Sequence, residues 1–288
     1  MTIDVSKAVG AVLPPGAATW TPDDVILYHL GIGAGTGPGK VTDPRELEYT
    51  YERRLKVLPS FGVVQVGSGP GGLGAVPGIS INFALVLHGE QSIEIHRPIP
   101  VAAQAETAAR VAAIYDKGRA ALIVLETVTR EKGGEPLFTN RFSIFARGEG
   151  GFGGDPGPKP GNEAPDRAPD LVVESPTVPH QALLYRLNGD KNPLHVDPEF
   201  AKMGGFETPI LHGLCSYGVV CKAVVDHALG GAVDRVAAYE ARFTGVVYPG
   251  ETIVTSMWRE DGRILLSAKT AERGSPVLGN AAIVERAV

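Results

Sequence analysis

The sequence predicts an α+β protein made of two related halves, in which antiparallel sheet curls around a long helix. Two short patterns occur once in each half: residues 22–30 and 179–187 both read Pro-x4-Leu-Tyr-x-Leu, and DKGR at 116–119 returns in part as DGR at 261–263. A segment rich in glycine and proline separates the copies, and one long apolar run supplies the helix. Repetition of this kind indicates duplication of one folding unit.

Length and composition agree with two such units. The chain has 288 residues, near two domains at about 150 residues per domain. Apolar residues make up 43%, enough for a packed core, and the net charge of −5 argues against nucleic acid as a partner. No apolar run approaches eighteen residues and the N-terminus lacks a signal-peptide pattern, so we expect no membrane insertion. Cys215 and Cys221 exclude a disulfide framework and favour the cytoplasm.

The segment Gly148 to Pro169 contains seven glycines and five prolines in 22 residues. Such a composition neither buries apolar surface nor sustains a strand ladder, and it is typical of a linker. We therefore expect an N-terminal unit at 1–147, a linker at 148–169 and a C-terminal unit at 170–288.

Each unit is expected to end in strands joined by turns. Apolar runs separated by Lys-Gly, Gly-Gly or Asp-Gly signals predict strands at 107–115, 119–130 and 137–146, and again at 237–243, 252–259, 263–271 and 277–284. Ahead of the second group, Leu211 to Leu229 is apolar on nearly all sides. A helix of that kind must be covered by other structure, so a sheet that curls around it is predicted.

The segment YRLNGDKNPLHVD at 185–197 carries the strongest chemical signal. It places Asp190, Asn192 and His195 within six residues, in a stretch where Asn-Gly and Pro break any regular helix. A carboxylate and an imidazole together can hold and polarise a water molecule, and Asn192 can orient either group or the substrate. The alternative interpretation is a polar turn that caps a helix at Asp197.

A second candidate lies at the start of the apolar helix, where His212 precedes Gly213. The first amides of a helix have no internal partner and carry partial positive charge. Glycine allows a ligand to approach this backbone, so the Gly213 amide can stabilise a developing thioester enolate. Gly213 as a packing glycine is the alternative. His212 by itself is more simply read as a buried, hydrogen-bonded residue at the helix start.

YRLNGDKNPLH followed by PILHGL resembles the signature of the MaoC-like dehydratases and the peroxisomal-type 2-enoyl-CoA hydratase 2, along the whole chain. The resemblance implies a double hotdog fold in which the N-terminal hotdog binds the acyl tail and lacks catalytic residues. It implies that Asp190 and His195 handle the water, that Asn192 supports them and that the Gly213 amide binds the thioester carbonyl. Gly33 stands in the first copy where Asp190 stands in the second, so one site per chain is expected.

The same resemblance implies substrate contacts at His88 and Gly89, at Lys117 and at Phe243. Lys117 has a physical rationale as a point charge for a phosphate. An ordinary turn lysine and, for His88, a core residue at a strand end are the alternatives.

The activity that the resemblance implies is (R)-specific hydration of a trans-2-enoyl thioester, or the reverse dehydration, without cofactor or metal. The partner is an acyl-CoA or acyl-carrier-protein thioester, and a homodimer is expected because hotdog sheets have open edges. The alternatives are a hotdog thioesterase and a non-catalytic acyl-CoA binding protein. Acyl-chain length, carrier and direction stay open.

Three other motifs are set aside. Residues 67–72 satisfy Gly-x-Gly-x-x-Gly, but the residues after them cannot open a helix and no βαβ alternation accompanies the motif. A transition-metal site at Asp190, His195 and His212 lacks a recognised ligand spacing. Cys215 is expected to be structural, because apolar surroundings raise a thiol pKa.

Overall fold

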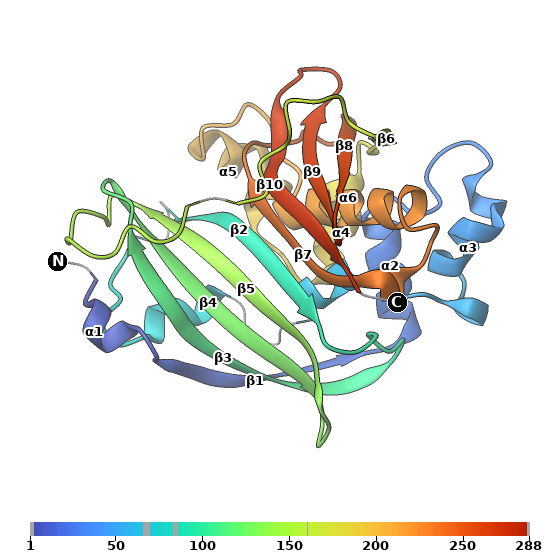
Figure 1. Ribbon diagram of the computed structural model, residues 1–288. Helices are drawn as coiled ribbons and strands as arrows, with labels where there is room; N and C mark the ends of the chain where they lie inside the picture. The colour runs from blue at the N-terminus through green and yellow to red at the C-terminus, as the bar shows by residue number, and fades with distance from the viewer. Residues whose placement is uncertain (1–2, 66–69, 83–85, 160, 287–288) are drawn as a thin grey trace.

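The computed structural model describes residues 3–65, 70–82, 86–159 and 161–286. Its ten strands form one antiparallel sheet (Figure 1). The strands are β1 (Val12–Trp20), β2 (Val86–Ile95), β3 (Ala103–Asp116), β4 (Ala120–Glu131), β5 (Pro136–Arg147), β6 (Leu171–Pro176), β7 (Val236–Phe243), β8 (Thr252–Glu260), β9 (Arg263–Thr270) and β10 (Pro276–Glu285). The α-helices are α1 (Val5–Ala8), α2 (Pro22–Gly31), α3 (Pro44–Thr50), α4 (Gln181–Tyr185), α5 (Pro198–Met203) and α6 (Gly213–His227).

The strand order repeats itself about the middle of the sheet. The order is β1-β3-β4-β5-β2-β7-β10-β9-β8-β6, so each half has its own first strand at the edge and its second strand at the centre. β2 pairs with β7 from Glu90 opposite Arg242 to Glu94 opposite Ala238, and this ladder joins the halves. The duplicated double hotdog architecture is confirmed.

All seven predicted strands are present with ends within a few residues of those expected, and the predicted helix is α6. Three strands escaped prediction: β1, β2 and β6. The edge strand β1 contains Pro14 and Pro15, and its pairing with β3 shifts register between Leu13 and Gly16. Proline normally interrupts the hydrogen-bond ladder of a strand, so a strand that contains two prolines is not predicted from its sequence pattern.

The two halves differ in what lies on the concave face of the sheet. In the second half α6 contacts β6, β7 and β8. In the described part of the first half, two short 3-10 segments, η3 (Pro59–Val63) and η4 (Pro70–Ala75), precede β2 instead of a long helix. Residues 67–69 of the Gly-x-Gly-x-x-Gly motif lie outside the described residues.

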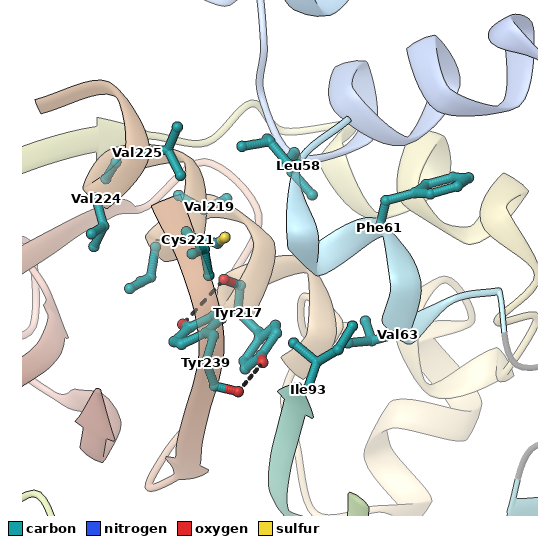
Figure 2. Packing of buried hydrophobic residues seen from close by; sticks show 14 of the residues in the cluster. Leu58, Phe61, Val63, Ile93, Tyr217, Val219, Cys221, Val224, Val225 and Tyr239 are labelled. Carbon is teal, nitrogen blue, oxygen red and sulfur yellow. Dashed lines mark hydrogen bonds between the residues drawn. The ribbon is translucent and has the colours of Figure 1, made fainter. Parts of the chain in front are cut away.

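The main core crosses from one half to the other, with α6 at its centre. Tyr217, Val219 and Cys221 of α6 lie beside Leu58 and Phe61 of the first half (Figure 2). Tyr217 also stacks on Tyr239 of β7, and each hydroxyl donates to the other residue's carbonyl, at 2.8 and 3.2 Å. Burial of such large side chains is the main stabilising contribution to the interface between the halves.

Close contact between α6 and α2 depends on a glycine. A β-carbon at Gly218 would lie 2.6 Å from the Cγ2 of Ile32 and 2.6 Å from the hydroxyl oxygen of Tyr28. Farther along the helix, the Lys222 ammonium bonds to Glu46 at 3.0 Å and to Asp226 at 2.6 Å. Apolar packing and a partly buried ion cluster therefore both bind the first half to α6. None of the helices in the described residues is both long and apolar enough to cross a membrane.

A fully buried histidine makes this core sensitive to acid. His29 donates from Nδ1 to the Tyr49 carbonyl at 2.9 Å and accepts the Leu58 amide on Nε2 at 3.3 Å. Burial lowers the pKa of His29 from 6.5 to about 4. Both nitrogens are in use, so protonation requires loss of a hydrogen bond.

We expect the free energy of unfolding to fall as the pH drops from 6.5 to 4. Over that range His29 binds a proton in the unfolded chain but stays neutral in the folded protein. The His29 contribution is on the order of 3 kcal/mol across that interval. In His29→Gln, whose amide can both donate and accept, that part of the pH dependence should be absent. Urea unfolding at pH 7 and pH 4.5 measures the difference, and an equal pH slope in both proteins would contradict it. His96→Gln, at an exposed position, serves as the control.

Candidate active site

The chemical loop predicted between Tyr185 and Asp197 folds as a series of short turns. α4 ends at Tyr185 and the chain reverses at Gly189, whose φ of +120° favours glycine. Asn192 then caps the 3-10 turn η7 (Pro193–His195) by accepting the Leu194 amide at 3.0 Å. The loop thereby exposes the Asp190 side chain while it buries His195.

His195 is held in one tautomer by a backbone carbonyl. Its Nδ1 lies 2.9 Å from the carbonyl oxygen of Ile210. Because a carbonyl only accepts, Nδ1 carries the hydrogen and Nε2 keeps a free lone pair. His195 can therefore accept a proton at a defined atom.

The His212 ring packs against the His195 imidazole. Its ring stacks on His195 with the centroids 3.8 Å apart and the planes at 28°. Its Nε2 donates to the backbone carbonyl of Asp190 at 3.2 Å, and the Tyr185 ring lies on it at 4.9 Å. As expected from the sequence, His212 is buried at the helix start, and it also ties the Asp190 loop to α6.

Both imidazoles are neutral at pH 7. Burial lowers the pKa of His195 below its usual 6.5, and burial together with the neighbouring His195 lowers that of His212 to about 4. A neutral His195 next to the Asp190 carboxylate is an acid–base pair of the kind that can take a proton from water and return it.

Asp190, His195 and His212 each bring one ligand atom within 4.8 Å of the others. This donor set fits a metal poorly. Lone pairs lie in the ring planes, so two stacked imidazoles direct theirs side by side rather than toward one tetrahedral centre. The arrangement suits a polarised water better than a metal ion.

The Gly213 amide lies beside this cluster at the N-terminus of α6. Gly213 is exposed although most of the helix is buried, and its position in the first turn leaves its N–H without an intrahelical partner. A β-carbon here would lie 3.2 Å from the Phe243 ring. The close approach of that aromatic ring accounts for the glycine, and the helix dipole favours a negatively charged oxygen at the amide.

All four residues predicted to contact substrate line a cavity of about 410 Å³. His88 and Gly89 come from β2, Lys117 from the β3–β4 turn and Phe243 from the end of β7. The His88 and Phe243 rings are 4.9 Å apart, and Phe243 leads on to Gly213. Burial lowers the pKa of His88 to about 4 although the charge of Asp190 opposes this. The cavity wall at Phe243 therefore adjoins the start of α6.

Sequence reasoning missed several of the groups that shape this site. The Ile210 carbonyl has no side-chain signal, because any residue supplies one. Arg242 and Glu90 form an ion pair at the cavity wall, where the β2–β7 ladder ends. Asn192 was expected to support Asp190 and His195. In the structure its backbone amide donates to the Asp190 carboxylate at 3.1 Å, and its side-chain oxygen accepts the Leu194 amide.

The remaining chemical candidate is inert. Cys215 is fully buried, its thiol donates to the Gly31 carbonyl at 3.3 Å, and burial raises its pKa far above that of a free thiol. The thiolate needed for nucleophilic attack is absent at neutral pH. The prediction that Cys215 is structural is confirmed.

Family models match the two halves separately. The MFE-2 hydratase 2 N-terminal domain matches residues 19–148, and the MaoC like domain matches residues 161–280. Enoyl-CoA hydratase ChsH3 of Mycobacterium tuberculosis is 48% identical over 96% of this chain and 97% of its own length. The peroxisomal enoyl-CoA hydratase 2 of Arabidopsis thaliana is 43% identical over 92% of this chain and 90% of its own.

A solved structure agrees with these relatives. The MaoC-like dehydratase of Phytophthora capsici superimposes with a TM-score of 0.86 at 34% identity, covering 99% of this chain and 98% of that one. The range matched by the MaoC like domain includes the loop that carries Asp190 and His195 and the start of α6. The chain therefore belongs to the family of MaoC-like dehydratases and type 2 enoyl-CoA hydratases.

Proposed function

We propose that this protein is an (R)-specific 2-enoyl-CoA hydratase, a hydro-lyase that also catalyses the reverse dehydration of 3-hydroxyacyl thioesters. The observation that carries the proposal is that Asp190 and neutral His195 lie together beside the start of α6, where Gly213 is next to Phe243 on the cavity wall. Relatives named enoyl-CoA hydratase, similar along nearly their whole length, support it.

In the proposed reaction the thioester oxygen accepts the Gly213 N–H, and a water lies between Asp190 and the free Nε2 of His195. This pair takes a proton from the water as its oxygen bonds to C3 of the enoyl group. The electron pair of the C2=C3 bond moves toward the thioester, and the acid–base pair then returns the proton it took from the water to C2 on the same face. The enolate oxygen carries the developing charge, so the Gly213 amide is worth several kcal/mol in the transition state, by the magnitude of about 3–4 kcal/mol known for one oxyanion donor.

The remaining assignments belong to the same proposal. The unit 1–147 would be the non-catalytic half that holds the acyl chain, with His88, Gly89, Lys117 and Phe243 along the thioester, and the unit 170–288 would be catalytic. The protein would work as a cytoplasmic homodimer in fatty-acid metabolism. The Arabidopsis relative is named as peroxisomal, so localisation by microscopy or fractionation decides the compartment.

Mixing the protein with crotonyl-CoA should remove the ultraviolet absorbance of the enoyl thioester without release of thiol. Asp190→Asn and His195→Gln should each lower kcat by about a hundredfold or more, since each removes one member of the acid–base pair. Asp261→Asn and His96→Gln, conservative changes at exposed sites, are the matched controls. If either catalytic variant kept more than a tenth of the activity, the assigned roles would be wrong.

Two other outcomes of that assay are informative. Release of free CoA, detected with a thiol reagent, would identify a thioesterase. Tight binding of crotonyl-CoA without any change in absorbance would identify a binding protein.

The pH profile tests the neutral state of His195. Burial holds the pKa of His195 below 6.5, so kcat/KM should be flat from pH 7 to 9 and decline only below pH 6.5 as His195 gains a proton. The measurement is the initial rate with subsaturating crotonyl-CoA in buffers of constant ionic strength. A decline centred at pH 7 or above would contradict the assignment of His195 as the acceptor, and His96→Gln should leave the profile unchanged.

A further inference from the structure

A second cavity lies at the end of the β2–β7 ladder that is farther from Gly213. This cavity, here called the far cavity, has a volume of about 290 Å³ and is lined by Ile95 and by residues of the segments 55–59 and 98–101. The cavity of about 410 Å³ beside Phe243 is called the substrate cavity. Among the described residues the two cavities have no lining residue in common. The proposed reaction makes no use of the far cavity, so its presence needs a separate explanation.

The far cavity is the counterpart of the substrate cavity under the internal symmetry of the sheet. β2 and β7 are equivalent strands of the two halves and pair antiparallel at the centre of the sheet (Figure 1). Phe243 ends β7 at the substrate cavity, and Ile95 ends β2 at the far cavity. Two equivalent antiparallel strands are related by a twofold rotation, so a duplicated fold built on them has an equivalent place at each end of the ladder.

The sequence beside the far cavity keeps a copy of the segment that begins α6. LPSFGVV at 58–64 repeats LCSYGVV at 214–220, with five of seven residues identical. The offset of 156 is close to the 157 that separates the two Pro-x4-Leu-Tyr-x-Leu patterns. The glycine of each copy permits a close contact: a β-carbon at Gly62 would lie 2.6 Å from the Cδ1 of Ile93, as one at Gly218 meets its own neighbours. The two segments are therefore equivalent in sequence and in packing.

This alignment shows which groups the far cavity has lost and which it has kept. Val57 stands where Gly213 stands in the other copy, and Gly33 stands where Asp190 does. Val57 is buried, yet its backbone amide donates to no acceptor among the described residues. A buried amide without an acceptor is uncommon, and here it is a donor available to a ligand. The far cavity has lost the catalytic groups but has kept space and a donor.

The charged groups of the far cavity favour an anion at one point. The Lys56 ammonium is already compensated, because it pairs with Glu48 at 2.5 Å. The Arg286 guanidinium donates to the neutral Ile95 carbonyl at 2.7 Å and has no carboxylate partner among the described residues. Asp234 is exposed on the same cavity and opposes an anion. Arg286 is therefore the group that attracts a carboxylate, and Asp234 is the group that weakens the attraction.

The rest of the lining is suited to an alkyl chain. Every described lining residue other than Lys56, Asp234 and Arg286 is aliphatic or proline. Such a wall offers no aromatic ring for a nucleobase or sugar and no hydroxyl or amide side chain for a peptide. The volume of about 290 Å³ is at the lower end of the range of small-molecule sites, which limits the ligand to a chain of moderate length.

We propose that the far cavity is a second, non-catalytic site that binds a medium-chain fatty acid. The carboxylate lies at Arg286 and the Val57 amide, and the alkyl chain lies against the aliphatic wall. A coenzyme A thioester has no free carboxylate for this position and is not a ligand of the far cavity. The proposal goes beyond the proposed function and does not depend on it, since none of these residues takes part in the hydration.

Isothermal titration calorimetry with octanoate tests the proposal through two opposite effects of charge. Arg286→Gln should weaken binding by about tenfold, the loss expected from one charge-assisted hydrogen bond. Asp234→Asn should strengthen binding, because it removes the opposing charge. From butanoate through hexanoate to octanoate the affinity should rise by about fourfold for each methylene that enters the apolar wall. Equal affinity in the unmodified protein and in both variants would overturn the proposal, as would absence of binding at millimolar octanoate.

A matched pair of variants locates the bound octanoate. Val233→Trp fills the far cavity, and Leu87→Trp fills the substrate cavity. Val233→Trp should abolish octanoate binding and Leu87→Trp should leave it unchanged, with circular dichroism and the thermal midpoint as checks of folding. The reverse pattern would place octanoate in the substrate cavity and overturn the proposal. If Val233→Trp does not fold, the exposed variants Arg286→Gln and Asp234→Asn decide the question.

Competition separates this proposal from the proposed function. Saturating crotonyl-CoA should leave the affinity for octanoate unchanged, and displacement of octanoate would overturn the far cavity as its site. Octanoate binding with the expected variant pattern, in a protein that does not hydrate crotonyl-CoA, supports the far cavity while only the proposed function fails. Hydration of crotonyl-CoA without octanoate binding overturns the far cavity and leaves the function standing.

Discussion

The short ladder between β2 and β7 is the contact on which the rest of the molecule depends. It joins two five-stranded halves into one sheet, and it stops at Glu90 and Arg242. Beyond that pair β2 and β7 are no longer paired, and His88, Gly89 and Phe243 line a cavity whose Phe243 wall adjoins Gly213. The end of the ladder therefore coincides with the opening between the halves.

The first half matters to the chemistry although its own copy of the loop has Gly33 in place of Asp190. Tyr28 and Ile32 of the first half press on α6 at Gly218, and Glu46 bonds to Lys222. α6 in turn carries the Gly213 amide at its N-terminus. Because packed interiors resist small displacements, the first half fixes where that amide lies. The two halves therefore share one packed core.

Much of this architecture was predictable because it follows from periodicity. The seven long strands and α6 have regular apolar patterns between glycine turns, and the loop of Asp190 and His195 has distinctive residue types at short spacing. Contacts made by backbone groups, or by side chains far apart in the sequence, could not be predicted because no residue pattern marks them. The Ile210 carbonyl that orients His195 could come from any residue, and the Glu90–Arg242 pair joins positions 152 residues apart.

The segment 148–159, which follows β5, shows a different limit of sequence reasoning. Its composition correctly predicts a segment without helix or strand, but composition says nothing of where a chain is bound. The anchor is Asp116, which looks in the sequence like an ordinary turn aspartate, and its hydrogen bonds reach glycines 35 and 37 positions away. A glycine-rich segment can lie directly against a sheet where glycines permit close contacts, as Gly150 does at Ala120 and Gly157 does at Tyr115.

The prolines of β1 have a consequence for how copies of this protein meet. The outer strands of the sheet are β1 and β6. β1 carries Pro14 and Pro15 at a register shift, and β6 is only six residues long and ends at Pro176. Proline offers no amide and short strands offer little ladder, so both borders are poor templates for another strand. Self-association by extension of the sheet is thus discouraged, so the expectation that open sheet edges lead to a homodimer loses its physical basis.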